Sequence, residues 1–277
     1  MPPTVPVFDP PLLPMPRLGL GTWPMKGAEC QAAVESALAL GYRHIDTAEM
    51  YGNEAEVGAG LRAAGLPRDQ VFVTSKAWWD RPDGASIRRA CEASLDRLGL
   101  DHLDLYMIHW PSPQLRLEDA LRGLARLRED RLARYVGVAN FPVGLMRRAL
   151  EAGLAPLACL QVEHHLFLDQ TRLRELVVPR GLALTSYSPV AKGAIAEDAT
   201  VVRIAAKHGA TPAQVALAWL LAMPGVAAIP KSASPERQRE NLEALRLRLD
   251  AADLEALAAL PKDRRLVSPG FAPDWDS

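Results

Sequence analysis

The feature that most constrains the fold of this chain is a repeated alternation of short apolar runs with longer helical patterns. Six of the apolar runs lack the period-two alternation of a half-exposed strand, as expected for a parallel sheet covered on both faces. They lie at 71–75, 103–108, 135–138, 157–162, 182–186 and 226–229. Two further runs, at 18–22 and 43–46, complete a set of eight predicted strands.

Helices are predicted between these strands. Apolar residues recur at intervals of three and four from Ile87 to Leu98, which places them on one face of a helix. Thr211-Pro212-Ala213-Gln214 has the form of a capping box, and Ser234-Pro235-Glu236 marks another helix start. Gly41 follows an apolar helical stretch and is expected to end it. Eight strands alternating with helices predict a single-domain α/β fold, the (β/α)8 TIM barrel, over residues 1–277.

A doubly wound dinucleotide-binding sheet is the main competing fold. Its first strand-to-helix turn should carry the sequence Gly-x-Gly-x-x-Gly. The segment Gly19-Leu20-Gly21-Thr22-Trp23-Pro24 lacks the third glycine, and Gly58-Ala59-Gly60 lies inside a helical pattern. The barrel therefore remains the simpler prediction.

Charge and composition exclude several classes of partner. The formal net charge of -1 offers no basic surplus for nucleic acid. Residues 1–17 lack the basic and apolar regions of a signal peptide, and the most apolar stretch, 215–230, is interrupted by Pro224-Gly225. We therefore expect no nucleic-acid or membrane partner. We also expect the protein to be a cytoplasmic monomer.

The three cysteines point to the same compartment. Cys30, Cys91 and Cys159 are widely spaced and match neither a disulfide framework nor a zinc site. A reducing cytoplasm suits all three.

Polar residues cluster where the predicted strands end. In a (β/α)8 barrel, functional side chains lie at the carboxyl ends of the strands. The residues at these ends are Asp46, Lys76, His109, Asn140, Gln161, Tyr187 and Lys231. Any one of them could be an ordinary exit from a strand into a loop, but seven together indicate a common pocket.

At these positions the chain resembles the aldo-keto reductases. Gly41-Tyr42-Arg43-His44-Ile45-Asp46-Thr47-Ala48, followed by Tyr51-Gly52-Asn53-Glu54, is similar to the first signature of that family. Val73-Thr74-Ser75-Lys76 and Asp104-Leu105-Tyr106-Met107-Ile108-His109-Trp110-Pro111 are similar to the next two. Ile229-Pro230-Lys231-Ser232 resembles the cofactor signature.

The end of the chain resembles a narrower group. Arg265-Leu266-Val267-Ser268-Pro269 and Ala272-Pro273-Asp274-Trp275 are similar to bacterial 2,5-diketo-D-gluconate reductases, as is the segment from Ala205 to Gln214. Members of this group also reduce methylglyoxal. The resemblance implies NADPH-dependent reduction of small polar dicarbonyls to alcohols, with residues 262–277 as a substrate loop over the pocket.

The resemblance assigns four catalytic residues. Tyr51 would donate the proton that carbonyl reduction requires, and His109 would orient the carbonyl oxygen. A free tyrosine has a pKa of about 10. The adjacent ammonium of Lys76 is expected to lower that pKa, with Asp46 keeping Lys76 charged through an ion pair.

The resemblance also implies two sets of binding residues. NADPH would be held by Gly21, Thr22, Trp23, Asp46, Asn140, Gln161, Tyr187, Ser188, Pro189, Ala191, Gly193, Lys231, Ser232, Arg237, Glu240 and Asn241. The small-molecule carbonyl substrate would lie among Trp23, Tyr51, Trp78, His109 and Trp110. The family usually has serine at position 139, next to Asn140, where this chain has Ala139.

The cofactor-binding residues have distinct expected tasks. Tyr187 would stack on the nicotinamide, and Gly193 would let the backbone approach the pyrophosphate. Lys231 and Arg237 would bind the 2′-phosphate, because Arg237 falls in the first turn of a predicted helix and a helix start favours an anion.

Two alternatives stay open on the sequence alone. A barrel of this superfamily can bind NADPH and regulate a partner with little turnover. A barrel hydrolase would need two carboxylates at one pocket, for which Asp46 and Glu163 are the evident candidates. A metal site is not expected, because the adjacent His164 and His165 would point in divergent directions on a strand.

Overall fold

The computed structural model describes residues 3–275 and contains an eight-stranded parallel sheet. Each strand pairs with the next along the chain. The strands are β1 (Leu20–Gly21), β2 (His44–Asp46), β3 (Phe72–Ala77), β4 (Leu103–Ile108), β5 (Ala133–Ala139), β6 (Leu157–Glu163), β7 (Ala183–Tyr187) and β8 (Val226–Ala228). All eight predicted strands are confirmed, with small shifts at their ends.

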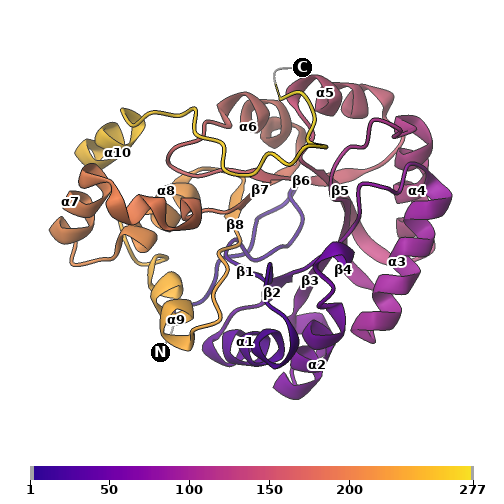
Figure 1. Ribbon diagram of the computed structural model, residues 1–277, viewed down its shortest axis with the longest axis horizontal. Coiled ribbons are helices and arrows are strands. Elements are labelled where there is room, and N and C mark those ends of the chain that lie inside the picture. Colours follow the sequence, from indigo (N-terminus) through magenta and orange to yellow (C-terminus); the bar gives the residue numbers. More distant parts are fainter. Residues whose placement is uncertain (1–2, 276–277) are drawn as a thin grey trace.

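The two edges of the sheet meet beside β1 and β8. Leu18 forms a parallel bridge with Ala228, and Gly21 forms one with Lys231. The N–H of Gly19 also donates to the carbonyl oxygen of Ala228 at 2.9 Å. The predicted (β/α)8 barrel is therefore confirmed, and Figure 1 shows its helices arranged around the sheet.

Helices follow the strands around the barrel. The α-helices are α1 (Gly27–Leu40), α2 (Glu54–Ala64), α3 (Gly84–Leu98), α4 (Leu117–Glu129), α5 (Val143–Ala152), α6 (Thr171–Val177), α7 (Ala199–Lys207), α8 (Pro212–Ala222), α9 (Pro235–Glu243) and α10 (Ala251–Ala258). Short 3-10 turns are η1 (Glu49–Tyr51), η2 (Arg68–Gln70), η3 (Val178–Arg180) and η4 (Ala191–Glu197).

The predicted helix boundaries have local physical causes. Gly41 ends α1 at φ 108°, a left-handed conformation that glycine adopts without a side-chain clash. Thr211 and Gln214 form the predicted capping box at the start of α8. The Ser234 hydroxyl accepts the N–H of Arg237 at the start of α9, so Arg237 lies in the first turn as expected.

The amino-terminal segment covers one end of the barrel. Val7 and Pro16 form an antiparallel bridge, and Phe8, Leu13 and Met15 pack in a cluster with Phe72, the first residue of β3. The opposite end, where the strands terminate, is left for the polar residues predicted to form the site. The main hydrophobic core consists of the apolar side chains packed between the sheet and the helices.

The carboxyl-terminal segment runs across that opposite end. In Figure 1 it is the yellow chain that leaves α10 and passes over the region of β6 and β7 toward α5. The main-chain N–H groups of Leu266 and Val267 donate to the carboxylate of Glu163 at 2.7 and 2.9 Å. Residues 1–2 and 276–277, which belong to the predicted barrel and tail, lie outside the described residues.

Two further expectations concern membrane-spanning helices and the three cysteines. Between residues 3 and 275, no helix is both long enough and apolar enough to cross a bilayer. Cys30, Cys91 and Cys159 are all buried and carry free thiols.

Candidate active site

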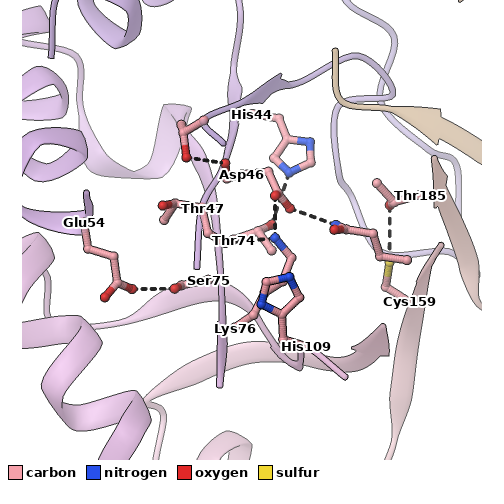
Figure 2. A network of polar contacts seen from close by, with 12 residues as sticks. His44, Asp46, Thr47, Glu54, Thr74, Ser75, Lys76, His109, Cys159 and Thr185 are labelled. Carbon is pink, nitrogen blue, oxygen red and sulfur yellow. Dashed lines mark hydrogen bonds and ion pairs between the residues drawn. The ribbon is translucent and has the colours of Figure 1, made fainter. Parts of the chain in front are cut away.

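A buried ion pair forms the floor of the site. Lys76, near the end of β3, places its Nζ 2.5 Å from Oδ1 of Asp46, the last residue of β2 (Figure 2). The same ammonium donates to the carbonyl oxygen of Thr47 at 2.9 Å. Burial lowers the pKa of Lys76, and the charge of Asp46 opposes that shift. The predicted pairing of Lys76 with Asp46 is therefore present.

Gln161 forms a hydrogen bond with the second oxygen of the Asp46 carboxylate. Its Nε2 donates to Oδ2 of Asp46 at 2.8 Å from β6, on the far side of the barrel. Both oxygens of Asp46 are thus hydrogen-bonded, one to an ammonium and one to an amide. A buried carboxylate satisfied in this way is fixed in orientation and can hold Lys76 in place.

Tyr51 lies above the ion pair on the 3-10 turn η1. The Lys76 Nζ lies 5.2 Å from the centroid of its ring. Burial raises the pKa of Tyr51 well above its usual value, and the negative charge of Asp46 adds to the increase. The pKa of Tyr51 is therefore raised and not lowered as expected, because burial and the charge of Asp46 dominate. Tyr51 is consequently protonated at neutral pH, the form that a proton donor needs.

His109 follows β4 and contacts Tyr51. The two ring centroids lie 5.5 Å apart in an edge arrangement. Burial lowers the pKa of His109 well below its usual value, and the charge of Lys76 acts in the same direction. The imidazole is therefore neutral at pH 7 and offers one N–H donor and one acceptor. Its buried Nδ1 has no hydrogen-bond partner among the described residues.

The predicted substrate walls form a continuous series of aromatic rings. Trp23 contacts Tyr51 at a centroid distance of 5.2 Å, and Trp78 contacts His109 at the same distance. Trp23 is 49% exposed, whereas Trp110 is only 4% exposed. Trp23, Tyr51, His109 and Trp78 are therefore joined by direct ring contacts, with Trp23 at the open side. The ring contacts of Trp110 are instead with the tail.

Two aromatic residues of the tail extend this series. Phe271 stacks on Trp79 at 4.9 Å and contacts Trp78 and Trp110 edge-on at 5.4 and 5.7 Å. Trp275 contacts Trp110 at 5.8 Å. Sequence reasoning missed Phe271, because only the return of the tail over β3 and β4 brings it to these tryptophans. A cavity of about 400 Å³ opens on its outer side, toward α5, and none of the four predicted catalytic residues lines it.

Asn140, one of the residues expected to hold NADPH, is already hydrogen-bonded through both its amide nitrogen and its amide oxygen. The Asn140 side chain donates to the carbonyl oxygen of His109 at 2.9 Å and accepts the Tyr187 hydroxyl at 2.8 Å. Asn140 has a left-handed φ of 60°. The Asn140 amide retains a second N–H and a second lone pair with which it can bind a ligand. Ala139 is fully buried and supplies no hydroxyl.

The predicted pyrophosphate loop has an unusual backbone. Left-handed φ values occur at Ser188, Ala191, Lys192 and Gly193. A Cβ on Gly193 would meet no atom within 4 Å, so its requirement for glycine comes from its φ of 94°. Pro189 lies in the same loop. Across the barrel, Thr22 donates from both its N–H and its hydroxyl to the carbonyl oxygen of Asp46.

Close packing explains the glycine that precedes Thr22. A Cβ on Gly21 would lie 2.7 Å from the carbonyl oxygen of Ile229, so no larger residue fits where β1 meets the segment after β8. The parallel bridge between Gly21 and Lys231 fixes Lys231 at this junction.

The predicted 2′-phosphate residues gather at the start of α9. Lys231 and Arg237 are exposed, whereas Ser232 is buried and donates to the carbonyl oxygen of Ser234 at 3.1 Å. Glu240 is also exposed. Asn241, also expected to hold NADPH, is buried.

Asn53 is a further residue that sequence reasoning did not single out. It is fully buried, accepts the Thr47 hydroxyl at 2.7 Å, and donates to the carbonyl oxygens of Thr22 and Met25 at 3.2 and 3.0 Å. It therefore joins the loop after Tyr51 to the loop that carries Trp23. The sequence feature that could have indicated this role is the position of Asn53 two residues after Tyr51.

The hydrolase alternative lacks its second carboxylate. Glu163 is fully buried, and its oxygens accept N–H groups from Leu266 and Val267 and a contact from His165 at 2.9 Å. The Glu163 carboxylate therefore binds the main chain of the tail. His164 instead contacts Ser186, so the two histidines diverge as expected. Residues 3–275 contain no group of three or more His, Cys, Asp or Glu side chains placed to hold a metal ion.

Comparisons with known proteins agree with this geometry. The chain is 40% identical over 266 residues to "Methylglyoxal reductase DkgB" of Escherichia coli O157:H7, covering 95% of this chain and 99% of that protein. It is 40% identical over 254 residues to an "Aldo-keto reductase" of Mycobacterium sp. (strain JLS), covering 91% of each. A solved structure described as a putative 2,5-diketo-D-gluconic acid reductase B matches with a TM-score of 0.92, 37% identity and coverage of 96% and 95%.

More distant structures share the same architecture. The aldose reductase of Schistosoma japonicum matches with a TM-score of 0.88 and 33% identity, covering 94% of this chain and 93% of that one. The model of the aldo/keto reductase family matches residues 17–262, which include the floor of the site and all four predicted catalytic residues. This chain therefore belongs to the aldo/keto reductase family.

Proposed function

We propose that this enzyme reduces small polar dicarbonyls, such as 2,5-diketo-D-gluconate or methylglyoxal, with NADPH as the hydride donor. The observation that carries the proposal is the group of Tyr51, His109 and the buried Lys76–Asp46 pair at the carboxyl end of the barrel. These side chains can supply and orient a proton at a carbonyl oxygen. NADPH, when bound, supplies the hydride.

The chain's own residues have separable tasks in this reaction. Tyr51 holds the proton for the substrate oxygen, and neutral His109 offers an N–H to the same oxygen. Asp46 and Gln161 hold Lys76 beneath the Tyr51 ring, where its positive charge favours the phenolate that is left after proton transfer. The aromatic residues around them exclude water from the reacting atoms.

The residues at the start of α9 suit NADPH. Lys231 and Arg237 present two exposed cations beside a helix N-terminus, where a phosphate is favoured. Arginine can bind a phosphate through two parallel hydrogen bonds. This charge arrangement supports a preference for the 2′-phosphorylated cofactor over NADH.

The aromatic walls support a small substrate. Trp23, Trp78, Trp110 and Phe271 surround the space next to Tyr51 and His109, which disfavours fused rings such as those of a steroid. A second carbonyl withdraws electrons and makes the neighbouring carbon a better hydride acceptor. Two of the similar proteins carry names that refer to dicarbonyl substrates.

The test is a comparison of cofactor oxidation with different carbonyl compounds. We expect the purified protein to oxidise NADPH with methylglyoxal and with 2,5-diketo-D-gluconate, to do so more slowly with NADH, and to react poorly with a bulky 3-ketosteroid. Binding of NADPH without turnover of any carbonyl would favour the regulatory barrel instead. A higher kcat/KM for the steroid would overturn the substrate proposal.

We also propose that the enzyme acts as a cytoplasmic monomer. Its free cysteines suit a reducing compartment. Sedimentation of the purified protein would test the oligomeric state, and a stable dimer would refute it.

A further inference from the structure

A buried glutamine ties the start of α9 to two neighbouring segments. Gln238 lies in α9 and is fully buried. Its Nε2 donates to the carbonyl oxygen of Ser232 at 3.0 Å and to that of Ala33, in α1, at 2.9 Å. The two helices lie side by side (Figure 1). One side chain therefore joins α9, α1 and the turn that follows β8.

Of these two hydrogen bonds, the one to Ser232 matters most for the turn. Ala33 lies inside α1, where its carbonyl oxygen also accepts a main-chain N–H of the helix. Ser232 is buried and lies outside any helix or strand, so its carbonyl oxygen has no such partner. A buried carbonyl without a donor is unfavourable. Loss of the Gln238 amide should therefore favour a different conformation of this turn.

A second set of hydrogen bonds holds the turn itself. The Ser232 hydroxyl donates to the carbonyl oxygen of Ser234 at 3.1 Å and accepts the N–H of Ser234 at 3.2 Å. The N–H of Arg237 donates to the hydroxyl of Ser234, and the N–H of Gln238 donates to its carbonyl oxygen at 2.9 Å. Residues 232–238 are therefore one connected unit, which the Gln238 side chain closes.

This unit carries both cations proposed to bind the 2′-phosphate. Lys231 and Arg237 are exposed, and Ser232 directly follows Lys231 while Gln238 directly follows Arg237. The hydrogen bond from Gln238 to Ser232 thus joins the direct neighbours of the two cations. It fixes the spacing of their backbones before a phosphate binds. A binding site ordered in advance loses less entropy when its ligand arrives.

Stability alone does not explain an amide at this position. The Oε1 of Gln238 is buried and has no hydrogen-bond partner among residues 3–275. A buried acceptor without a partner destabilises a fold, and an apolar side chain of the same length would avoid that loss. What the amide adds is the position that its Nε2 gives to Ser232.

We propose that Gln238 is a positioning residue for the 2′-phosphate of NADPH, acting through the spacing of Lys231 and Arg237. This inference rests on the proposed function and deepens it, because it assigns the preference for NADPH over NADH to a buried residue as well as to the two cations. Loss of the amide consequently weakens the binding of a cofactor that carries the 2′-phosphate and spares one that lacks it.

The experiment measures cofactor affinity in the absence of a carbonyl compound. Gln238→Met keeps the length of the side chain and removes the donor to Ser232. In fluorescence titrations we expect the Kd for NADPH to rise by about fivefold, the scale of one neutral hydrogen bond, and the Kd for NADH to stay within about twofold.

Gln170→Met is the matched control. Gln170 is also buried, and its Nε2 donates to a main-chain carbonyl, that of Glu163, at 2.7 Å. It lies at the start of α6 instead of α9. The same substitution there should leave the ratio of the two Kd values unchanged.

A second variant and thermal unfolding separate positioning from a general loss of structure. Gln238→Asn keeps an amide but is one methylene shorter, so it should raise the Kd for NADPH in the same way. Equal increases for NADPH and NADH would show that Gln238 only supports the fold, and an unchanged Kd for NADPH in a variant that unfolds cooperatively would also overturn the inference. A wild type that binds NADPH no more tightly than NADH would refute the cofactor part of the proposed function, and this inference with it.

Discussion

At the scale of single residues, the buried ion pair and the proton donor of the site are different groups. Asp46 and Gln161 fix Lys76 in a fully buried position, while Tyr51 remains protonated above it. The charged pair and the proton donor therefore lie on different segments, β2–β3 and η1, which Asn53 holds together. Small displacements of any of these segments should disturb proton transfer more than cofactor binding.

The charge at the start of α9 leads to a prediction on cofactor choice. Arg237→Ala should raise the KM for NADPH much more than that for NADH, because only NADPH carries the 2′-phosphate. The expected loss is about 1.5–3 kcal/mol, the range of a hydrogen bond to a charged group. Initial rates at varied cofactor concentration would measure it. Arg239→Ala is the matched control, since Arg239 is exposed on the same helix but beyond its first turn. Equal losses with both cofactors would refute the assignment.

At the scale of elements, the tail has an anchor and a separate aromatic end. Leu266 and Val267 anchor it to Glu163, and Phe271 and Trp275 pack on the tryptophans after β3 and β4. Because these two parts are separated by a few residues, the aromatic end can be removed without breaking the anchor.

Deleting residues 268–277 tests the role of that aromatic end. We expect kcat/KM for a dicarbonyl to fall by about tenfold or more, because water then reaches the reacting atoms and one wall of the site is lost. NADPH affinity, measured by fluorescence titration, should be retained. Unchanged dicarbonyl reduction in the truncated protein would show that the tail is not part of the substrate site.

A close contact between helices gives a prediction on stability. A Cβ on Gly123 in α4 would lie 2.3 Å from the Cα of Gly84 at the start of α3, so the two backbones would have to separate. Gly123→Ala should therefore destabilise the fold by about 1–3 kcal/mol in spite of the helix preference of alanine. Thermal unfolding would measure the loss. Gly270→Ala, where a Cβ meets no atom within 4 Å, should leave Tm unchanged. A Tm for Gly123→Ala at or above the wild type would contradict the packing argument.

At the scale of the whole molecule, three buried histidines link stability to pH. Burial lowers the pKa of His44 to about 4 and that of His164 to about 3, and it lowers the pKa of His109 as well. In the unfolded chain each has a pKa of about 6.5. Between pH 6.5 and about 4 the unfolded chain therefore binds protons that the folded chain does not.

The free energy of unfolding should consequently fall as pH decreases through this range. The proton uptake on unfolding should approach three per molecule from these residues. Urea denaturation at a series of pH values between 7.5 and 4.5 would measure it. His164→Gln should reduce the slope by about one proton. A stability that stays constant between pH 6.5 and 4.5 would contradict neutral burial of these side chains.

The sequence predicts the parts of this molecule that depend on local pattern. The strands follow from apolar runs, and the ends of α1, α8 and α9 follow from Gly41, Thr211 and Ser234. The resemblance to the aldo-keto reductases implies the pairing of Asp46 with Lys76, and the two side chains meet because both lie at strand ends on one end of the barrel.

Contacts that depend on the complete fold were not predictable in the same way. Gln161 reaches Asp46 from a strand 115 positions away, and Phe271 reaches Trp78 only after the tail returns across the barrel. The direction of the Tyr51 pKa was mispredicted because burial and the charge of Asp46 depend on packing, which no motif reports.

The central claim is that Tyr51 donates the proton in carbonyl reduction, and Tyr51→Phe tests it most directly. This substitution keeps the ring that contacts Trp23 and His109 and removes only the hydroxyl. We predict that kcat for methylglyoxal reduction falls by about 10² or more, the scale of a positioned general acid, while the Kd for NADPH is unchanged. A variant with near-wild-type kcat would contradict the assignment of Tyr51 as the proton donor.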